Sequence, residues 1–167
     1  RTYTYAELHR EVQRMAAALL ALGVKKGDRV QIYMPMVAEA AIAMLASVRI
    51  GAIHSVVFGG FASGSLATRI DDAQPTVIVS ADAGSRTGRV VPYKPLLDDA
   101  INLASHKPQA VLMVDRGLAA MNLVAGRDHL WGEMREKHLD AQVPVEWVVT
   151  DPASSELYTS GTTGKPK

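Results

Sequence analysis

Residues 158–167, YTSGTTGKPK, combine the residue types that bind phosphate groups. Gly161 and Gly164 let the backbone turn tightly and approach an anion. Consecutive amide groups in such a turn form a concave anion-binding nest. Hydroxyl donors and a positive charge would come from Thr159, Ser160, Thr162, Thr163 and Lys165. Composition alone fits a flexible surface turn before a basic tail equally well.

This stretch is not a Walker phosphate loop. That loop has four residues between its glycines, and a serine or threonine follows its lysine. Here only Thr162 and Thr163 separate the two glycines, and Pro166 follows Lys165. If the stretch binds a nucleotide, it does so as a different kind of loop.

A second group suited to phosphate is the sequence Arg86-Thr87-Gly88-Arg89. Arginine guanidinium groups pair well with phosphate oxygens, often through two parallel hydrogen bonds. Taken without other information, these residues are more simply interpreted as an exposed basic loop.

Other chemically capable residues lack the spacing of a site. The chain has no cysteine, which excludes disulfides and thiolate metal sites. No histidine has metal-ligand spacing, and we predict no metal site; the five are His9, His54, His106, His129 and His138. The carboxylate pairs Asp71-Asp72 and Asp98-Asp99 lie near or within predicted helices, where a solvated face is the simpler interpretation.

Length and charge point to one ordinary globular domain. The chain has 167 residues, of which 48% are hydrophobic and 21% charged, with a net charge of +1. A charge so near zero argues against nucleic acid or an anionic membrane as a partner. The longest apolar region, residues 38–62, is interrupted by Glu39, Arg49 and His54, so we expect no membrane span.

Alternating helices and strands must position the candidate loops. Thr4 and Glu7 predict a capping box at the start of a helix that ends near Gly23. Further helices are expected at residues 36–50, around Leu66 and Ile70, and from Pro95 to Ala104, with a polar loop before the last of these. Strands are expected at residues 29–34, 54–58, 76–80, 110–114 and 145–149. This alternation predicts an α/β fold with a largely parallel sheet flanked by helices.

The ten residues 158–167 closely resemble the signature of the adenylate-forming superfamily. That superfamily includes acyl-CoA synthetases, luciferases and the adenylation domains of peptide synthetases. The resemblance implies that the chain has the fold of the large N-terminal AMP-binding domain. It also implies that the loop grips the β- and γ-phosphates of ATP and then pyrophosphate, through Thr159, Ser160, Gly161, Thr162, Thr163, Gly164 and Lys165.

Residues 54–101 resemble the short-chain acyl-CoA synthetases within that superfamily. The sequences FGGF (58–61) and RIDD (69–72) are shared with that group. Three further stretches are closer to propionate–CoA ligases than to acetate–CoA ligases, namely residues 80–86, 91–94 and 114–119. The resemblance implies a coenzyme A site in which Arg86 and Arg89 receive the 3′-phosphate and Gly60 lies against CoA. The residues of this site are Gly60, Arg86, Thr87, Gly88 and Arg89.

The implied reaction has two steps. A short carboxylate, which we expect to be propionate, attacks the α-phosphate of ATP carrying Mg²⁺, and the CoA thiol then attacks the acyl-adenylate. Acetate or another short-chain acid is an alternative substrate, and a non-catalytic nucleotide- or CoA-binding module is an alternative function.

The resemblance also implies how much of such an enzyme the chain contains. In the superfamily the adenine site, the acyl pocket and the main catalytic lysine follow the phosphate loop. We therefore expect residues 1–167 to be a partial N-terminal domain, truncated at the loop, without the C-terminal domain and inactive alone. The expected location is the cytoplasm, or the mitochondrial matrix if the source is eukaryotic, and the oligomeric state is left open.

Overall fold

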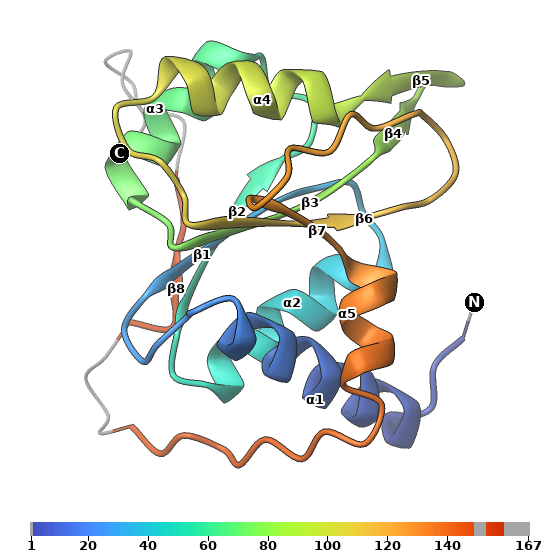
Figure 1. Ribbon diagram of the computed structural model, residues 1–167, viewed down its shortest axis with the longest axis vertical. Helices are drawn as coiled ribbons and strands as arrows, with labels where there is room; N and C mark the ends of the chain where they lie inside the picture. Colours follow the sequence, from blue (N-terminus) through green and yellow to red (C-terminus); the bar gives the residue numbers. More distant parts are fainter. Residues whose placement is uncertain (1, 149–152, 159–167) are drawn as a thin grey trace.

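The computed structural model describes residues 2–148 and 153–158, with Arg86 described through its backbone (Figure 1). The predicted ATP phosphate-binding residues, Thr159 to Lys165, therefore lie outside the described residues. In the described part of the chain, no helix is long and apolar enough to cross a membrane.

Six strands form one parallel sheet in the order β7-β6-β3-β1-β2-β8 (Figure 1). The inner strands are β6 (Ala110–Val114), β3 (Val77–Ala81), β1 (Arg29–Met34) and β2 (Ile53–Phe58). The edge strands are short: β7 (Asp128–Leu130) and β8 (Ser155–Glu156). Every residue of β3 and β6 is buried, as expected for strands covered on both faces.

Helices cover both faces of the sheet (Figure 1). One face carries α1 (Tyr5–Ala21), α2 (Ala38–Arg49) and α5 (Trp131–Lys137), and the other carries α3 (Ser63–Ala73) and α4 (Tyr93–Leu103). Neighbouring β1 side chains enter opposite cores: Ile32 packs with the α1 and α2 residues, and Tyr33 packs with the α3 and α4 residues. The predicted α/β fold with a parallel, helix-flanked sheet is confirmed.

The predicted helix start at Thr4 is also confirmed. The Thr4 hydroxyl accepts a hydrogen bond from the Glu7 amide at 3.2 Å, and the Glu7 carboxylate accepts one from the Thr4 amide at 2.7 Å. The helix ends at Ala21, and Gly23 then adopts a φ of +92°. Local capping and a glycine stop therefore define α1.

The polar loop predicted after residue 80 is wrong, because this segment is an antiparallel hairpin. Strands β4 (Ala83–Arg86) and β5 (Arg89–Pro92) pair through a two-residue turn. Thr87 and Gly88 have φ values of +48° and +78°, as in the turns that match the twist of paired strands. The following helix begins at Tyr93, so Pro95 is its third residue rather than its first.

The strand predicted at residues 145–149 is wrong for the part that the structure describes. Residues 145–148 belong to no strand and follow a segment that lies along α1 and α2 (Figure 1). Helix residues satisfy its backbone: Gln13 accepts from the Val143 amide at 2.7 Å, and Arg49 donates to the Val143 carbonyl at 2.7 Å. Residues 145–148 thus contain β-branched residues but have no partner strand in the described structure. The sequence analysis also missed β7, β8 and α5.

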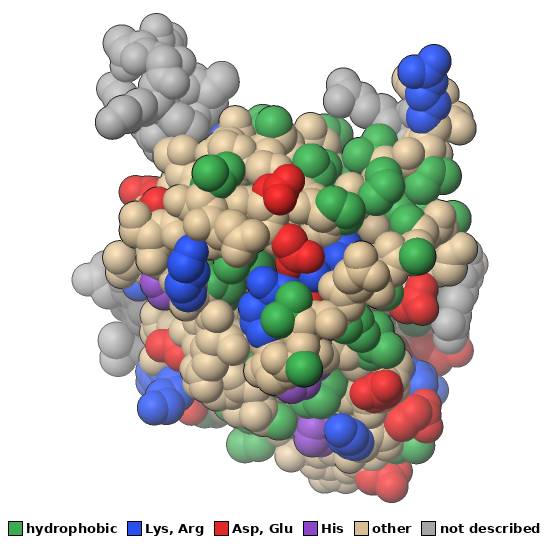
Figure 2. Space-filling view, turned by 45° about the horizontal axis from the view of Figure 1, so that its top comes forward, with side chains coloured by type: hydrophobic (Ala, Val, Ile, Leu, Met, Phe, Trp, Pro, Cys, Tyr) green, Lys and Arg blue, Asp and Glu red, His purple; other side chains and the backbone are tan. Residues whose placement is uncertain are grey.

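A charged cluster ties α4 to β7, where the sequence predicted a solvated acidic face. The Lys94 ammonium, on a side chain only 2% exposed, pairs with Asp128 at 3.0 Å and also contacts Asp98. Arg127 pairs with the same two carboxylates, at 2.5 Å and 2.6 Å. The interpretation of Asp98 as simply solvated is therefore wrong. Figure 2 shows basic and acidic side chains intermingled on one face of the molecule.

Replacing Asp128 with Asn should destabilise the protein most at neutral pH. Burial raises the pKa of the Asp128 carboxyl, but hydrogen bonds from Arg127, the Val124 amide and Lys94 outweigh it and hold the pKa below its ordinary value of 3.8. A carboxyl with a lowered folded pKa stabilises the fold above its unfolded pKa and loses that contribution as pH falls through the folded pKa. The free energy of unfolding in urea should fall by about 3 kcal/mol at neutral pH.

The effect should shrink when the same measurement is made at a pH below the ordinary value of 3.8, because the stabilisation is lost as pH falls through the lowered folded pKa. Asp99→Asn is the matched control, because Asp99 is an exposed acid on the same helix. An equal loss of stability at both pH values would contradict the electrostatic explanation.

Candidate functional site

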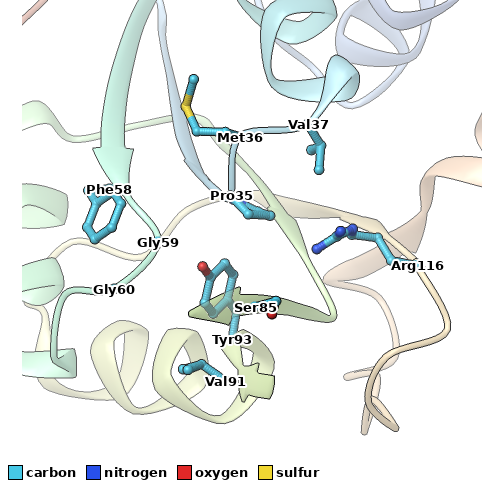
Figure 3. Close-up of a pocket in the computed structure, with 10 residues that line it drawn as sticks. All are labelled: Pro35, Met36, Val37, Phe58, Gly59, Gly60, Ser85, Val91, Tyr93 and Arg116. Atoms are coloured by element: carbon cyan, nitrogen blue, oxygen red, sulfur yellow. The ribbon is translucent and has the colours of Figure 1, made fainter. Parts of the chain in front are cut away.

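A pocket of about 380 Å³ lies at the carboxyl edge of the parallel sheet (Figure 3). Its lining comes from the segments after β1 and β2, from the β4–β5 hairpin, from the start of α4 and from the segment after β6: Pro35, Met36, Val37, Phe58, Gly59, Gly60, Ser85, Val91, Tyr93 and Arg116. Open α/β sheets bind ligands outside the carboxyl ends of their strands. The pocket is therefore the candidate ligand site of the described residues.

Tyr93 forms one wall of the pocket, and two glycines make room for it. A Cβ at Gly59 would lie 2.5 Å from the Tyr93 ring, and one at Gly84 would lie 2.6 Å from Tyr93 Cζ. The Tyr93 ring also lies 5.2 Å from the ring of Tyr33 in the core. Sequence analysis missed Gly59, Gly84 and Tyr93 as site residues, although the Gly59-Gly60 pair after a strand was a usable signal.

Gly60, predicted to lie against CoA, does line the pocket. A Cβ at this position would lie 2.6 Å from Cε1 of Phe58, whose side chain is 58% exposed. The close neighbour inside the chain is thus the outer end of an exposed ring. The contact of Gly60 with CoA stays a prediction.

The predicted Arg86-Thr87-Gly88-Arg89 site forms the tip of the β4–β5 hairpin. The two arginines are direct partners in the register, while Ser85 and Val91 of the same hairpin line the pocket. The binding of a phosphate group by these residues stays a prediction.

Arg116 is a pocket residue that the sequence analysis did not select. Among the described residues of the lining it alone carries a charge. Its guanidinium donates to the Ala83 carbonyl at 2.8 Å, and Figure 3 shows its side chain on the opposite side of the pocket from Phe58. Burial raises the pKa of the Tyr93 phenol, an effect that Arg116 partly offsets, so this wall carries a neutral phenol beside a cation.

A fully buried carboxylate, Asp82, fixes the segment that carries Arg116. It accepts hydrogen bonds from the backbone amides of Ala83 at 2.7 Å, Leu118 at 2.6 Å and Ala119 at 3.1 Å. Three amide donors satisfy a charge that would otherwise be costly to bury. The only sequence signal was a single aspartate directly after a buried strand.

Among the described residues, no group of histidine, aspartate or glutamate side chains could hold a metal ion. The His106 ring, for example, contacts the Pro75 carbonyl at 2.8 Å, and the His106 backbone amide donates to the Asp71 carboxylate at 2.8 Å. The site can therefore supply cations, amides and apolar walls, but no metal-ligand set from its described residues.

A parallel sheet with helices on both faces and a pocket outside its carboxyl ends defines the class of open α/β proteins that bind ligands at this edge of the sheet. The family model of the AMP-binding enzymes matches residues 1–167, and the chain belongs to that family.

Three proteins that this chain resembles are acyl-CoA ligases or synthetases by name. The chain is 63% identical to a propionate–CoA ligase of Salmonella typhimurium, over 100% of this chain and 27% of that protein. It is 47% identical to an acetyl-coenzyme A synthetase of Shewanella pealeana, over 100% of this chain and 26% of that protein. The solved acetoacetyl-CoA synthetase from Streptomyces lividans superposes with a TM-score of 0.87 at 30% identity, covering 99% of this chain and 25% of that one. The chain spans about a quarter of the length of these relatives.

Gly84→Ala should destabilise the protein because the new methyl group and Tyr93 cannot occupy the same space. Overpacking of this kind costs about 1–3 kcal/mol, measured as the free energy of unfolding in urea. Gly64→Ala is the matched control: Gly64 lies in α3, and a Cβ there would meet nothing within 4 Å. It should leave the stability unchanged or raise it by about 0.5 kcal/mol. Equal behaviour of the two variants would show that Tyr93 does not constrain residue 84.

Proposed function

We propose that this chain is part of the N-terminal adenylation domain of an ATP-dependent short-chain acyl-CoA synthetase. The observation that carries the proposal is 63% identity to a propionate–CoA ligase along all 167 residues. The proposed reaction converts propionate, ATP and CoA to propionyl-CoA, AMP and pyrophosphate through an acyl-adenylate. Acetate is the second candidate substrate, which the 47% identity to an acetyl-coenzyme A synthetase favours.

In the first step the carboxylate attacks the α-phosphate of ATP, and pyrophosphate leaves. Residues 159–165 would hold the β- and γ-phosphates through backbone amides, hydroxyl groups and the Lys165 ammonium. Mg²⁺ enters this proposal as the metal carried by ATP, since the described residues offer no metal-ligand group. The role of this part of the chain is then to bind and orient the departing phosphates.

In the second step the CoA thiol attacks the acyl carbon and AMP leaves. The pocket beside Gly60 supports a CoA site, because it joins apolar walls at Phe58 and Val91 to a hairpin that ends in two arginine positions. CoA likewise has alkyl segments in its pantetheine arm and a 3′-phosphate at its adenosine end. Arg89 is exposed at the hairpin tip, where its guanidinium can reach an external phosphate.

The first test is exchange of pyrophosphate into ATP by the complete enzyme that contains this chain. Exchange should require a short carboxylate, with a higher kcat/KM for propionate than for acetate. Exchange that prefers acetate would select the second candidate. Absence of exchange with every short carboxylate would overturn the synthetase proposal.

The second test concerns the hairpin arginines. Arg86→Ala and Arg89→Ala should each raise the KM for CoA by about tenfold or more, the effect of losing a hydrogen bond to a charged phosphate. Exchange of pyrophosphate into ATP should stay near wild type, since CoA takes no part in it. Dephospho-CoA is the sharper probe: wild type should prefer CoA to it, and the variants should hardly distinguish the two.

Arg10→Ala provides the matched control, because Arg10 is an exposed arginine on α1. It should keep the wild-type preference for CoA. If both hairpin variants also keep that preference, the hairpin does not recognise the 3′-phosphate.

A further inference from the structure

One side of α3 joins the pocket to the segment that precedes the predicted phosphate loop. Four residues make this connection, which we name the Arg69 clamp: Phe61, Arg69, Asp72 and Tyr158. Arg69 and Asp72 are three residues apart on α3 and so face the same way. Phe61 directly follows the pocket residue Gly60, and Tyr158 directly precedes Thr159.

The Arg69 guanidinium contacts both aromatic rings of the clamp. Its central carbon lies 4.4 Å from the centroid of the Phe61 ring and 5.5 Å from that of the Tyr158 ring. Both distances are within the range in which a cation is attracted to a ring face. Arg69 is only 9% exposed, and it also donates to the Ser65 carbonyl at 2.8 Å. Its position is therefore fixed from several sides.

Asp72 holds the other end of Tyr158. The Tyr158 hydroxyl donates to the Asp72 carboxylate at 2.6 Å. Burial, and then this hydrogen bond, raise the pKa of the Tyr158 phenol, so that the group stays protonated and able to donate. The ring and the hydroxyl of Tyr158 are thus held by different residues of the same helix.

The Phe61 end of the clamp is anchored to the sheet. Tyr33, which is fully buried on β1, donates its hydroxyl to the Phe61 carbonyl at 3.1 Å. The backbone amide of Phe61 also bonds to the Phe58 carbonyl at 3.3 Å. Contacts through Arg69 and Phe61 therefore connect Tyr158 to the same turn that lines the pocket.

The main chain offers little alternative support next to Tyr158. Strand β8 has two residues, Ser155 and Glu156, which pair with β2, and the His54 amide of β2 also donates to the Ser154 carbonyl at 3.2 Å. One ion pair, between Arg29 and Glu156 at 2.9 Å, reinforces it. So short an edge strand contributes little on its own, and side-chain contacts from α3 must supply much of the positioning of Tyr158.

We propose that Arg69 and Asp72 are positioning residues, which hold Tyr158 and thereby set where residues 159–165 start relative to the Gly60 pocket. The proposal rests on the proposed function, because the ATP role of that loop is itself proposed. Neither residue touches the reacting atoms in this scheme. Loss of the clamp should therefore weaken the handling of ATP and pyrophosphate without impairing the thioester step.

Tyr158→Phe and Asp72→Asn in the complete enzyme test this inference with little risk to folding. Each should raise the KM for ATP in pyrophosphate exchange by about fivefold, the effect of one lost hydrogen bond. Formation of the thioester from supplied acyl-adenylate should keep its wild-type rate. The double variant should be no worse than either single variant, because both remove the same interaction.

A second measurement does not depend on activity. Deuterium uptake by the backbone amides of residues 159–165, followed by mass spectrometry without ligand, should be about fivefold faster in both variants. Uptake by α1 should not change. Arg69→Lys should show the same pattern, because an ammonium keeps the charge but loses the planar guanidinium that lies near both rings.

The controls are Tyr5→Phe and Asp99→Asn, which make the same chemical changes at exposed positions on α1 and α4. Unchanged uptake by residues 159–165 in Tyr158→Phe and Asp72→Asn would overturn the positioning role, whatever the activity. So would equal damage to both half-reactions. Faster uptake in an enzyme whose wild type exchanges no pyrophosphate would support the positioning role and overturn the proposed function instead.

Discussion

The parallel pairing of β1 with β2 and β3 is the constraint on which the rest of the structure depends. Met34 at the end of β1 lies opposite Phe58 at the end of β2, and Val30 lies opposite Val77 of β3. Parallel register brings the carboxyl ends of all three strands to one edge, so the segments that follow them must emerge together. The pocket is made from those segments. Helices α2 and α3 return the chain to the opposite edge between these three strands, which lets residues far apart in sequence share one site.

The core and the site are parts of one packed unit. Tyr33 shows this most directly: its ring packs against Tyr93 in the pocket wall, and its hydroxyl holds the Phe61 carbonyl. Burial, with a smaller effect of Tyr93, raises the pKa of Tyr33 to about 12. The phenol is therefore a neutral donor. Dense packing transmits small displacements, so the two glycines that accommodate Tyr93 matter to the site as well as to stability.

Buried charges are satisfied in two different ways around the pocket. Asp82 accepts hydrogen bonds from backbone amides and so organises a loop, whereas Lys94 and Asp128 pair with each other and organise the contact of α4 with β7. Neither arrangement involves Arg116 of the pocket or Arg89 of the hairpin tip. Arg116 is held through a neutral carbonyl, and Arg89 has no carboxylate partner among the described side chains. In the proposed CoA site these two guanidinium groups would face an anionic ligand.

The sequence alone determined the fold class, the inner strands with the helices between them, and the family. Hydrophobic periodicity, the Thr4–Glu7 capping box and glycine stops are local signals, and a parallel sheet covered by helices follows from their alternation. The phosphate-loop residues also came from sequence, through a ten-residue resemblance, and they stay a prediction. Tertiary structure alone decided that residues 145–148 form no strand, because β-strand propensity cannot identify the partner that satisfies a backbone. It also decided the roles of Asp82, Tyr93, Arg116 and the Arg69 clamp, because each depends on contacts between residues that only folding brings together.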